Sequence, residues 1–457
     1  MNAIQSKLES NKLFSNQLLL FLTCVLAFLE SQRFFFSNSV GYFCLIALLF
    51  AFLSPNKEIK HSLIILSLFL YEDLVVMASN ATPQFIRNIL IIFLFFFFLK
   101  YLTSIKLKLN RAIIFLIFLS IISINTLLYI NALNPVDFNI FRYNAFLIII
   151  LFLIICTNTN FNLSINLNFL IYPILFYLIG ETINFFFYQD IWKHELKEYL
   201  NYSSLKSMIL MPFIYFLIYK KNFIYILFLF ISTNIVIAGY GSRYIFLSFY
   251  LFVFLYVFFY LKYNLFLKLF LTFILFFSLF LVAQNLEGSF KTTALLKYIF
   301  EMPLKDFNLS NLFYEIDRVR VMEHKLILSQ SIYDILFGKG LGSGLYDSNS
   351  YLSFVRFDQT AYSEKEIITK VFYNFHDPWT DIGIRIGLIP FFIIMLKFLF
   401  NSYFYLKKSD EKNVFIISCV FVLIINAWFQ VIGLIVIFLF YKSLTNNRLG
   451  KKEFNSF

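Results

Sequence analysis

A histidine, an arginine and a cluster of glycines share the one long polar stretch of this sequence. His376 lies in NFHDPWTDIGIRIGLIP, and Gly387 follows it on the same segment. Arg320 precedes the cluster GKGLGSG, which begins at Gly338. A neutral imidazole can take a proton from a hydroxyl group, and a guanidinium holds phosphate oxygens in a planar fork at any relevant pH. These residue types suit a reaction in which a sugar hydroxyl attacks a donor whose leaving group is a pyrophosphate.

Each of these residues also has a structural explanation. Asp377 can orient His376, or it can cap a helix that begins at Pro378. The glycine pattern lacks the GK[ST] of a nucleotide-binding loop, so backbone flexibility beside a cleft and a simple tight turn explain it equally well. Arg318 and Arg320 are two residues apart and lie on different faces of a helix, so we expect only one of them to reach a site.

The composition predicts that membrane helices position these residues. Hydrophobic residues make up 60% of the 457 positions and charged residues only 14%, which is far from the composition of soluble domains. Backbone groups in lipid must be paired internally, so we predict an all-α polytopic membrane protein. Cysteines 24, 44, 156 and 419 lie in apolar runs, which predicts no disulfide framework. His61, His194 and His324 show no ligand spacing, so neither a metal nor another cofactor is expected.

The apolar runs give the expected chain path. Spans are predicted at 16–31, 36–53, 62–79, 84–99, 112–130, 139–156, 168–187, 205–219, 222–238, 244–261, 265–283 and 379–399. The last run, 414–441, is interrupted by Asn426 and Gln430, and a basic tail follows it. The positive-inside rule places that tail in the cytoplasm with the other basic loops and the N-terminus only if the run is a short hairpin, which gives about 14 spans. The net charge of +12 is then mainly a topology signal, and no nucleic-acid partner is expected.

This path divides the chain into membrane segments and one outer loop. Residues 1–283 hold spans 1–11, residues 284–376 form the loop, and residues 377–457 hold the last spans and the tail. The segment Tyr314 to Leu328 predicts an amphipathic helix against the membrane. Several ionisable residues fall in the outer halves of spans, where either pairing between helices or a functional role explains them: Glu72, Asp73, Arg87, Arg142 and Glu181.

Three segments in combination resemble the O-antigen polymerase and O-antigen ligase superfamily of bacterial membrane glycosyltransferases. GSRYIFLSFYLF resembles the family's Ser-Arg turn, with Ser242 and Arg243 at the matching positions. RVMEHKLILSQSIYDILFGKGLGSG resembles its periplasmic helix and glycine loop, and HDPWTDIGIRIGLIP resembles its histidine segment. The resemblance covers residues 239 to 390. The chain departs from the family pattern at Asp377, where Asn is common, at Pro390, and at His324, where Trp is frequent.

The resemblance implies transfer of an undecaprenyl-pyrophosphate-linked glycan to an acceptor hydroxyl at the periplasmic face of the bacterial inner membrane. His376 would accept the proton of the acceptor hydroxyl. The pyrophosphate would be held by Arg243, Arg320, Arg356 and Arg385, beside a loop made flexible by Gly338, Gly340 and Gly342. Besides the lipid-linked glycan and membrane lipids, a chain-length regulator and a flippase are the partners implied.

The resemblance favours a polymerase that joins glycan chains to lipid-linked repeat units. Three alternative functions stay open. An O-antigen ligase would use the same donor and transfer the glycan to lipid A core. A lipid-linked oligosaccharide flippase would also have many spans and buried charges, but it has little use for this outer loop. A structural assembly partner would tolerate changes in the loop.

Overall fold

The computed structural model describes residues 2–32, 42–70, 165–187, 206–220, 222–240, 243–257, 264–270, 272–273, 318–340, 344–354, 364–373, 383–393 and 411–426, together with single residues between these ranges. The described part is mostly helical and includes one two-stranded antiparallel sheet. The predicted helical class is therefore confirmed for this part of the chain, and the small sheet is an addition to it.

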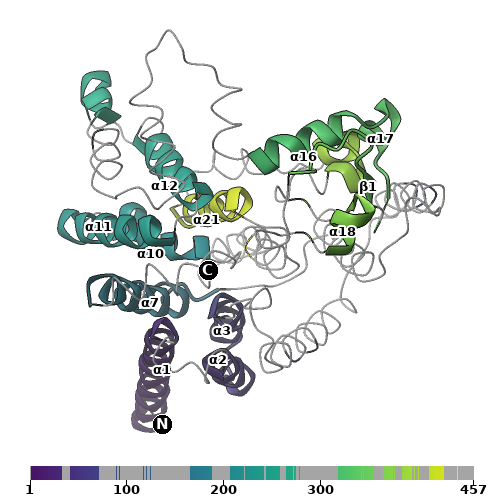
Figure 1. Cartoon of the computed structure of the whole chain (residues 1–457). Coiled ribbons are helices and arrows are strands. Elements are labelled where there is room, and N and C mark those ends of the chain that lie inside the picture. The colour runs from purple at the N-terminus through teal and green to yellow at the C-terminus, as the bar shows by residue number, and fades with distance from the viewer. Residues whose placement is uncertain are drawn as a thin grey trace.

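A bundle of apolar helices forms the larger part of the described structure (Figure 1). Its helices are α1 (Asn2–Ser31), α2 (Tyr42–Leu53), α3 (Lys57–Leu70), α7 (Asn168–Phe187), α11 (Phe223–Tyr240), α12 (Arg243–Leu255) and α21 (Glu411–Asn426). Between α7 and α11 the chain passes through η4 (Lys206–Leu210), α10 (Met211–Tyr215) and η5 (Phe216–Lys220). Their apolar runs carry few helix-breaking residues, and Pro212 lies in the first turn of α10, where its missing N–H has no helical partner to lose.

Hydrogen bonds between helices fix the relative directions of neighbouring elements. The thiol of Cys44, near the start of α2, donates to the carbonyl of Ser67, near the end of α3, so these two helices are antiparallel. Ser62, in the second turn of α3, bonds the backbone of Asn166 just before α7 at 2.9 Å, so α3 and α7 begin at the same end of the bundle. These directions match a chain that alternates through the bundle.

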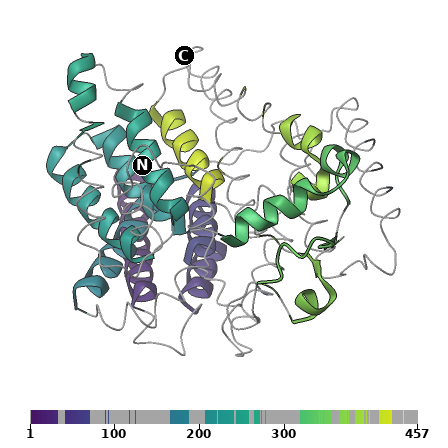
Figure 2. The same ribbon diagram turned by 45° about the horizontal axis from the view of Figure 1, so that its top comes forward.

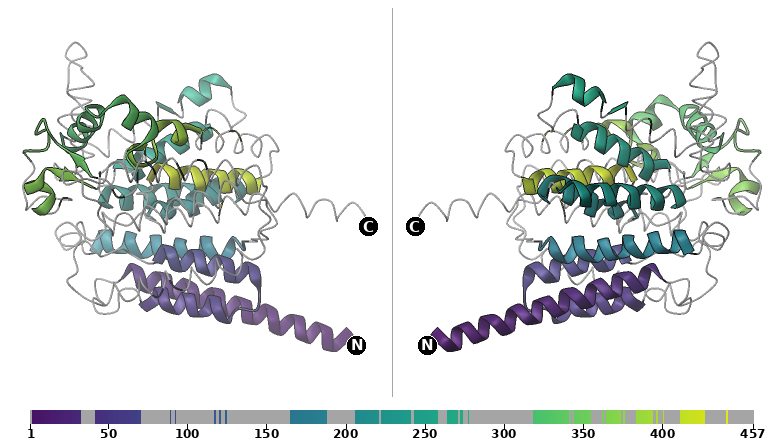
Figure 3. Two further views of the ribbon diagram at one scale, coloured as in Figure 1. Left: turned by 90° about the vertical axis from the view of Figure 1, so that its right-hand side faces the viewer. Right: turned by 90° about the vertical axis from the view of Figure 1, so that its left-hand side faces the viewer.

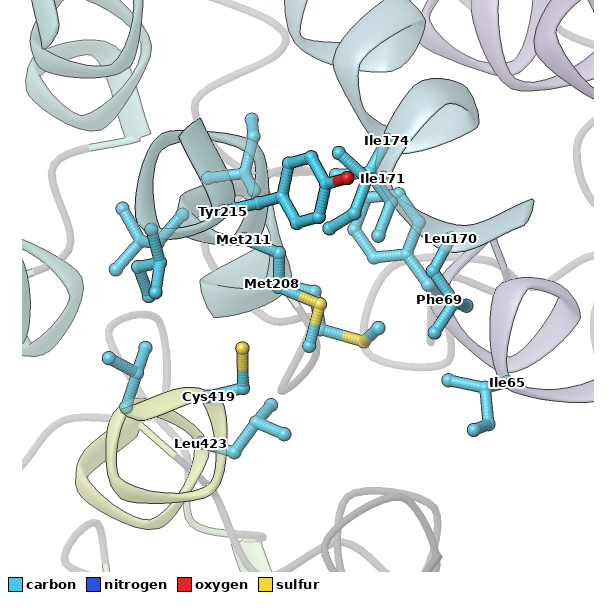
Figure 4. Close-up of a cluster of buried hydrophobic side chains, with 14 of the residues drawn as sticks. Ile65, Phe69, Leu170, Ile171, Ile174, Met208, Met211, Tyr215, Cys419 and Leu423 are labelled. Carbon is cyan, nitrogen blue, oxygen red and sulfur yellow. The ribbon is translucent and has the colours of Figure 1, made fainter. Parts of the chain in front are cut away.

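The bundle core is a continuous apolar cluster. Side chains from α3, α7, η4, α10 and α21 meet in it, among them Phe69, Met208 and Leu423 (Figure 4). Phe69 and Tyr177 pack edge to face with ring centroids 5.0 Å apart, a geometry that aromatic pairs prefer. Close packing of this kind holds helices together in water and in lipid alike.

One described helix, Asn168–Phe187, is long and apolar enough on its own to cross a membrane. Shorter apolar helices cover Ser15–Ser31, Phe43–Leu53, Met208–Lys220, Phe223–Ile237 and Val414–Leu423. The predicted spans at 84–99, 112–130 and 139–156 lie outside the described residues apart from single positions. The total of about 14 spans therefore stays a prediction.

A second, smaller body comprises α16 (Arg318–Leu328), α17 (Ile332–Phe337), β1 (Leu345–Tyr346), α18 (Glu364–Thr369) and β2 (Val371–Phe372). We call it the loop unit, and Figure 2 shows α16 leading into it from the side of the bundle. It has its own buried cluster, which includes Leu326, Phe372 and Ile384. The side views place it at the end of the bundle opposite to the N-terminal end of α1 (Figure 3).

The predicted end of the loop at residue 376 stays a prediction, because residues 376–382 lie outside the described part of the chain. We placed the end of the loop at residue 376 and a span at 379–399, but Ile384 still packs in the loop-unit cluster, whereas Ile386 packs in the bundle cluster. A helical turn covers residues 383–386, Gly387 breaks it with a φ of 87°, and a new helical segment covers 388–393. Hydropathy does not reveal this break because Ile386 before Gly387 and Leu388 after it are both apolar.

Candidate functional site

Helix α16 carries Arg318 and Arg320, of which we expected only one to reach a site. The guanidinium carbon of Arg318 lies 4.1 Å from the ring centroid of Phe354, a cation–π contact within the loop unit. Arg320 is partly buried. On the same helix the carboxylate of Glu323 is buried and accepts a hydrogen bond from the hydroxyl of Tyr362. The helix is thus fixed to the loop unit at several points, and its two arginines have different surroundings.

The short helix α17 leads into the glycine loop, residues 338–344. Ser331 caps its start, with the backbone N–H of Asp334 donating to the serine hydroxyl oxygen at 3.1 Å. Gly338 ends it with a φ of 82°, and its N–H donates to the carbonyl of Asp334 at 2.8 Å. A glycine takes this conformation without the steric cost that other residues incur.

The backbone amides at the start of the glycine loop are already bonded. Besides Gly338, Lys339 donates its N–H to the carbonyl of Ile384 at 2.8 Å, and Gly340 donates to the carbonyl of Arg385 at 3.1 Å. A phosphate-binding loop needs such amides to point at its ligand. This arrangement corresponds to the tight turn considered above, and it joins the loop to the segment that follows His376.

Two glycines make that junction possible. A Cβ on Gly338 would collide with the backbone of residues 385–387, and a Cβ on Gly387 would collide with the backbone of Leu336 and Phe337. Both glycines have positive φ angles. The backbones therefore touch at a place where no side chain fits, which explains why Gly387 and the glycine cluster occur together in this sequence.

The far end of the glycine loop contacts the segment that precedes His376. A Cβ on Gly344 would collide with the Val371 side chain, and β1 pairs with β2 in the register Leu345 to Phe372. The guanidinium of Arg385 donates to the carbonyl of Tyr373. The glycine loop thus touches the chain on both sides of the histidine segment, and Arg385 links those two sides directly.

Lys339 and Asp334 form a buried ion pair that the sequence did not reveal. The ammonium lies 3.7 Å from an Asp334 carboxylate oxygen and donates to the Gln330 amide oxygen at 2.6 Å. Burial lowers the pKa of Lys339 and raises the pKa of Asp334, while the attraction between the two charges opposes both shifts. The neighbouring Arg385 lowers the pKa of Lys339 further.

The structure describes some of the predicted site residues, and others lie outside its described part. Gly338, Gly340 and Gly342 all adopt positive φ angles in the loop, whose flexibility stays a prediction. Arg385 has an exposed fraction of only 1% and lies in the junction, and Arg320 lies on α16. Arg243 begins α12, but its side chain is outside the described part, as are Arg356 and His376.

A second polar cluster lies between α1 and α7 in the bundle. Glu30 and Glu181 have exposed fractions of 0% and 1%, and the amide of Asn184 donates to the carbonyl of Ser31 at 2.8 Å. We predicted a buried acid at Glu181 but missed Glu30, although it lies within the predicted span 16–31. Glu72, Asp73, Arg87 and Arg142, the other charges expected in spans, lie outside the described residues.

Searches for related proteins found no matching family model, no matching curated protein and no matching solved structure. Among the described residues, no group of three or more His, Cys, Asp or Glu side chains is arranged to hold a metal ion. The described part of the site therefore offers cations and backbone turns, and it joins the glycine loop to the residues on either side of the segment 376–382.

Proposed function

We propose that this chain is a bacterial inner-membrane glycosyltransferase of the O-antigen polymerase type. The observation that carries the proposal is the junction in the loop unit, where the glycine loop contacts the chain before and after the segment that holds His376. A catalytic base must be held in a defined position relative to its substrate. A loop that fixes both ends of the histidine segment is suited to that task.

The surface of the bundle supports a membrane location. Large apolar side chains are exposed along several described helices, including Phe187 on α7, Phe223 and Ile224 on α11, and Phe266 in the helical segment 265–270 that follows α12. Such a surface is unfavourable in water but is normal against lipid. With the N-terminus in the cytoplasm, the loop unit at the opposite end of the bundle would lie in the periplasm (Figure 3).

The proposed reaction needs no nucleotide because the donor already carries a pyrophosphate leaving group. His376 takes the proton from a hydroxyl of the lipid-linked repeat unit, and the hydroxyl oxygen attacks the anomeric carbon of the growing glycan. The bond from that carbon to the pyrophosphate oxygen breaks as the new glycosidic bond forms. Undecaprenyl pyrophosphate departs with the bonding electrons, and the proton remains on the imidazole until it passes to solvent.

Fixed cations would stabilise the departing pyrophosphate. Arg320 is a candidate because α16 packs on the same cluster as Phe372 and Phe375, which precede His376. Arg385 is buried in the junction next to the glycine loop. Guanidinium groups held away from bulk water stabilise a developing anion more strongly than they would in water. Arg243 and Arg356 complete the proposed set from the resemblance.

The test is the lipopolysaccharide ladder of a deletion strain complemented with wild type, His376→Ala, Arg320→Ala or the control His324→Ala. His324 is an exposed histidine on α16, so its removal should leave the ladder unchanged. We expect His376→Ala to give core carrying a single repeat unit, and Arg320→Ala to shorten or abolish the ladder. Membrane levels of each variant are measured on the same samples.

The pattern of products separates the competing functions. Core without glycan, with long chains accumulating on undecaprenyl pyrophosphate, would identify a ligase. Repeat units retained on the cytoplasmic face would identify a flippase. A normal ladder from His376→Ala at wild-type protein levels would refute the proposed chemistry.

A further inference from the structure

The corner between α16 and α17 exposes large apolar side chains. Leu328 has an exposed fraction of 72% and Ile332 of 76%, and Tyr333 is also exposed. We call these three residues the elbow. Exposed apolar residues that occur singly need no explanation, but three within one corner of a polar segment do.

The elbow is connected through Phe337 to the junction, and the helical segment that follows the junction also exposes apolar side chains. Tyr333 packs against Phe337 with ring centroids 5.1 Å apart and the ring planes tilted by 37°, and the backbone of Phe337 touches Gly387 at the junction. Directly after Gly387, the segment 388–393 exposes Ile389, Phe392 and Ile393. The junction therefore places α17 beside the point where the chain would enter the lipid.

The polar residues around the elbow suit the headgroup layer. Lys325 is exposed one turn before Leu328 on α16, and a lysine there can reach lipid phosphates while its stem covers apolar surface. Tyrosine, as at position 333, is enriched at membrane interfaces because its ring is apolar and its hydroxyl is polar. Two exposed serines, Ser329 and Ser331, separate the apolar positions.

From this continuity we infer that the elbow binds the lipid of the outer leaflet, and that α17 is an interfacial anchor of the loop unit. The apolar side chains would enter the boundary between headgroups and acyl chains, to a depth of about 5–10 Å. The anchor fixes the height of the glycine loop, and with it the junction, at the membrane surface. This inference rests on the proposed membrane location but not on the proposed glycosyl transfer.

Fluorescence quenching by brominated lipids tests the anchor. In a chain with Cys24, Cys44, Cys156 and Cys419 replaced by alanine, a single cysteine carries a polarity-sensitive probe at position 332, 393 or 349. The full chain is reconstituted in bilayer discs whose lipids carry bromine near the headgroup or near the end of the acyl chain. Asn349 lies in an exposed turn of the loop unit and serves as the aqueous control.

We expect the probe of Ile332→Cys to lose emission with bromine near the headgroup and to be protected from iodide in the water. The probe of Ile393→Cys should also be quenched by lipid, and that of Asn349→Cys only by iodide. If Ile332→Cys does not yield folded protein, Leu328→Cys provides the same measurement.

Two outcomes would overturn the inference in different ways. Quenching at position 332 by iodide alone, with lipid quenching at 393 intact, would show that the elbow faces water or a protein absent from the discs. Absence of lipid quenching at 393 as well would refute the membrane location itself. Loss of the lipopolysaccharide ladder in the variants tested above bears on neither outcome.

Discussion

The bundle and the loop unit each enclose a buried apolar cluster, but different contacts bring their segments together. In the bundle, whole helix faces pack side chain against side chain, as at Phe69 and Tyr177. In the loop unit, the cluster is small and backbone touches backbone at Gly338 and Gly387. A packed helix face can adjust to a change by shifting rotamers, whereas a backbone contact has no side chain to move. The loop unit should therefore be the more easily disrupted of the two.

The largest effect is expected for Gly387→Ala. The new Cβ would collide with backbone atoms of Leu336 and Phe337, and the residue would be held at a φ of 87°. The left-handed conformation alone costs roughly 1–2 kcal/mol, and the backbone shift brings the total to about 4 kcal/mol. Hydrogen–deuterium exchange of the amides of Lys339 and Gly340, which donate into this junction, should become about a thousandfold faster.

Gly383→Ala is the matched control for that substitution. Gly383 lies in the helical turn of the same segment, and its Cβ would meet only the Leu388 side chain at an ordinary 3.5 Å. We expect unchanged exchange at Lys339 and Gly340. Equal disruption by both substitutions would mean that the segment tolerates no added methyl group, and that the backbone contact is not the cause.

The buried ion pair is expected to give the next largest effect. Lys339→Met leaves the Asp334 carboxylate buried without its cation, which should cost about 3 kcal/mol of loop-unit stability. Replacing both residues, as Asp334→Leu with Lys339→Met, should recover most of that loss because no uncompensated charge remains. Limited proteolysis of the loop unit during thermal unfolding measures all three chains. A double variant as unstable as the single one would show that the pair is needed for more than charge balance.

The same pair predicts a pH dependence. Burial raises the pKa of Asp334, so between its ordinary and its raised value the folded state binds more protons than the unfolded state. Stability then falls as pH rises through that window. The double apolar variant lacks this titration, so its melting temperature relative to wild type should increase over the range that begins at about pH 4, the ordinary pKa of an aspartate, and extends upward. A constant difference over this range would contradict the pKa shift.

The bundle was the more predictable region because hydropathy records the pattern of its contacts. The expected span at 168–187 coincides with α7. The expected span at 222–238 begins one residue before α11 and ends two residues before that helix does. In a membrane, long apolar runs must be helical, and their apolar faces must be covered by lipid or by other helices. Sequence alone did not give the partners, such as α7 between α1 and α3, because any apolar face can pack against several others.

In the loop unit, residue types were informative but geometry was not. A tight turn was one of the two explanations that the sequence left open for Gly338, Gly340 and Gly342, and their positive φ angles agree with it. Nothing in the sequence showed that Gly338 and Gly387 touch each other, because a backbone contact between distant segments leaves no periodic pattern. The Lys339–Asp334 pair was missed for a different reason. The two residues are five positions apart across a helix end, where the spacing rules for regular helices do not apply.

The smallest effect is expected from a glycine in the bundle, and it completes the comparison. Gly180 on α7 also lies against another segment, but the atoms that an added Cβ would meet belong to side chains rather than backbone: the hydroxyl and Cβ of Ser31 and the amide nitrogen of Gln32. The Ser31 hydroxyl can rotate away at the loss of its 2.6 Å hydrogen bond to the Phe28 carbonyl, a cost of about 1 kcal/mol, and a small shift of Ser31 relieves the contact with its Cβ at 2.9 Å. The higher helix propensity of alanine offsets up to about 1 kcal/mol in return. Gly180→Ala should therefore change the melting temperature of the purified chain little, whereas Gly180→Leu, which cannot be accommodated by one rotation, should lower it clearly. If Gly180→Ala proves as disruptive as Gly387→Ala, then the bundle too depends on backbone-close contacts, and the distinction between the two regions fails.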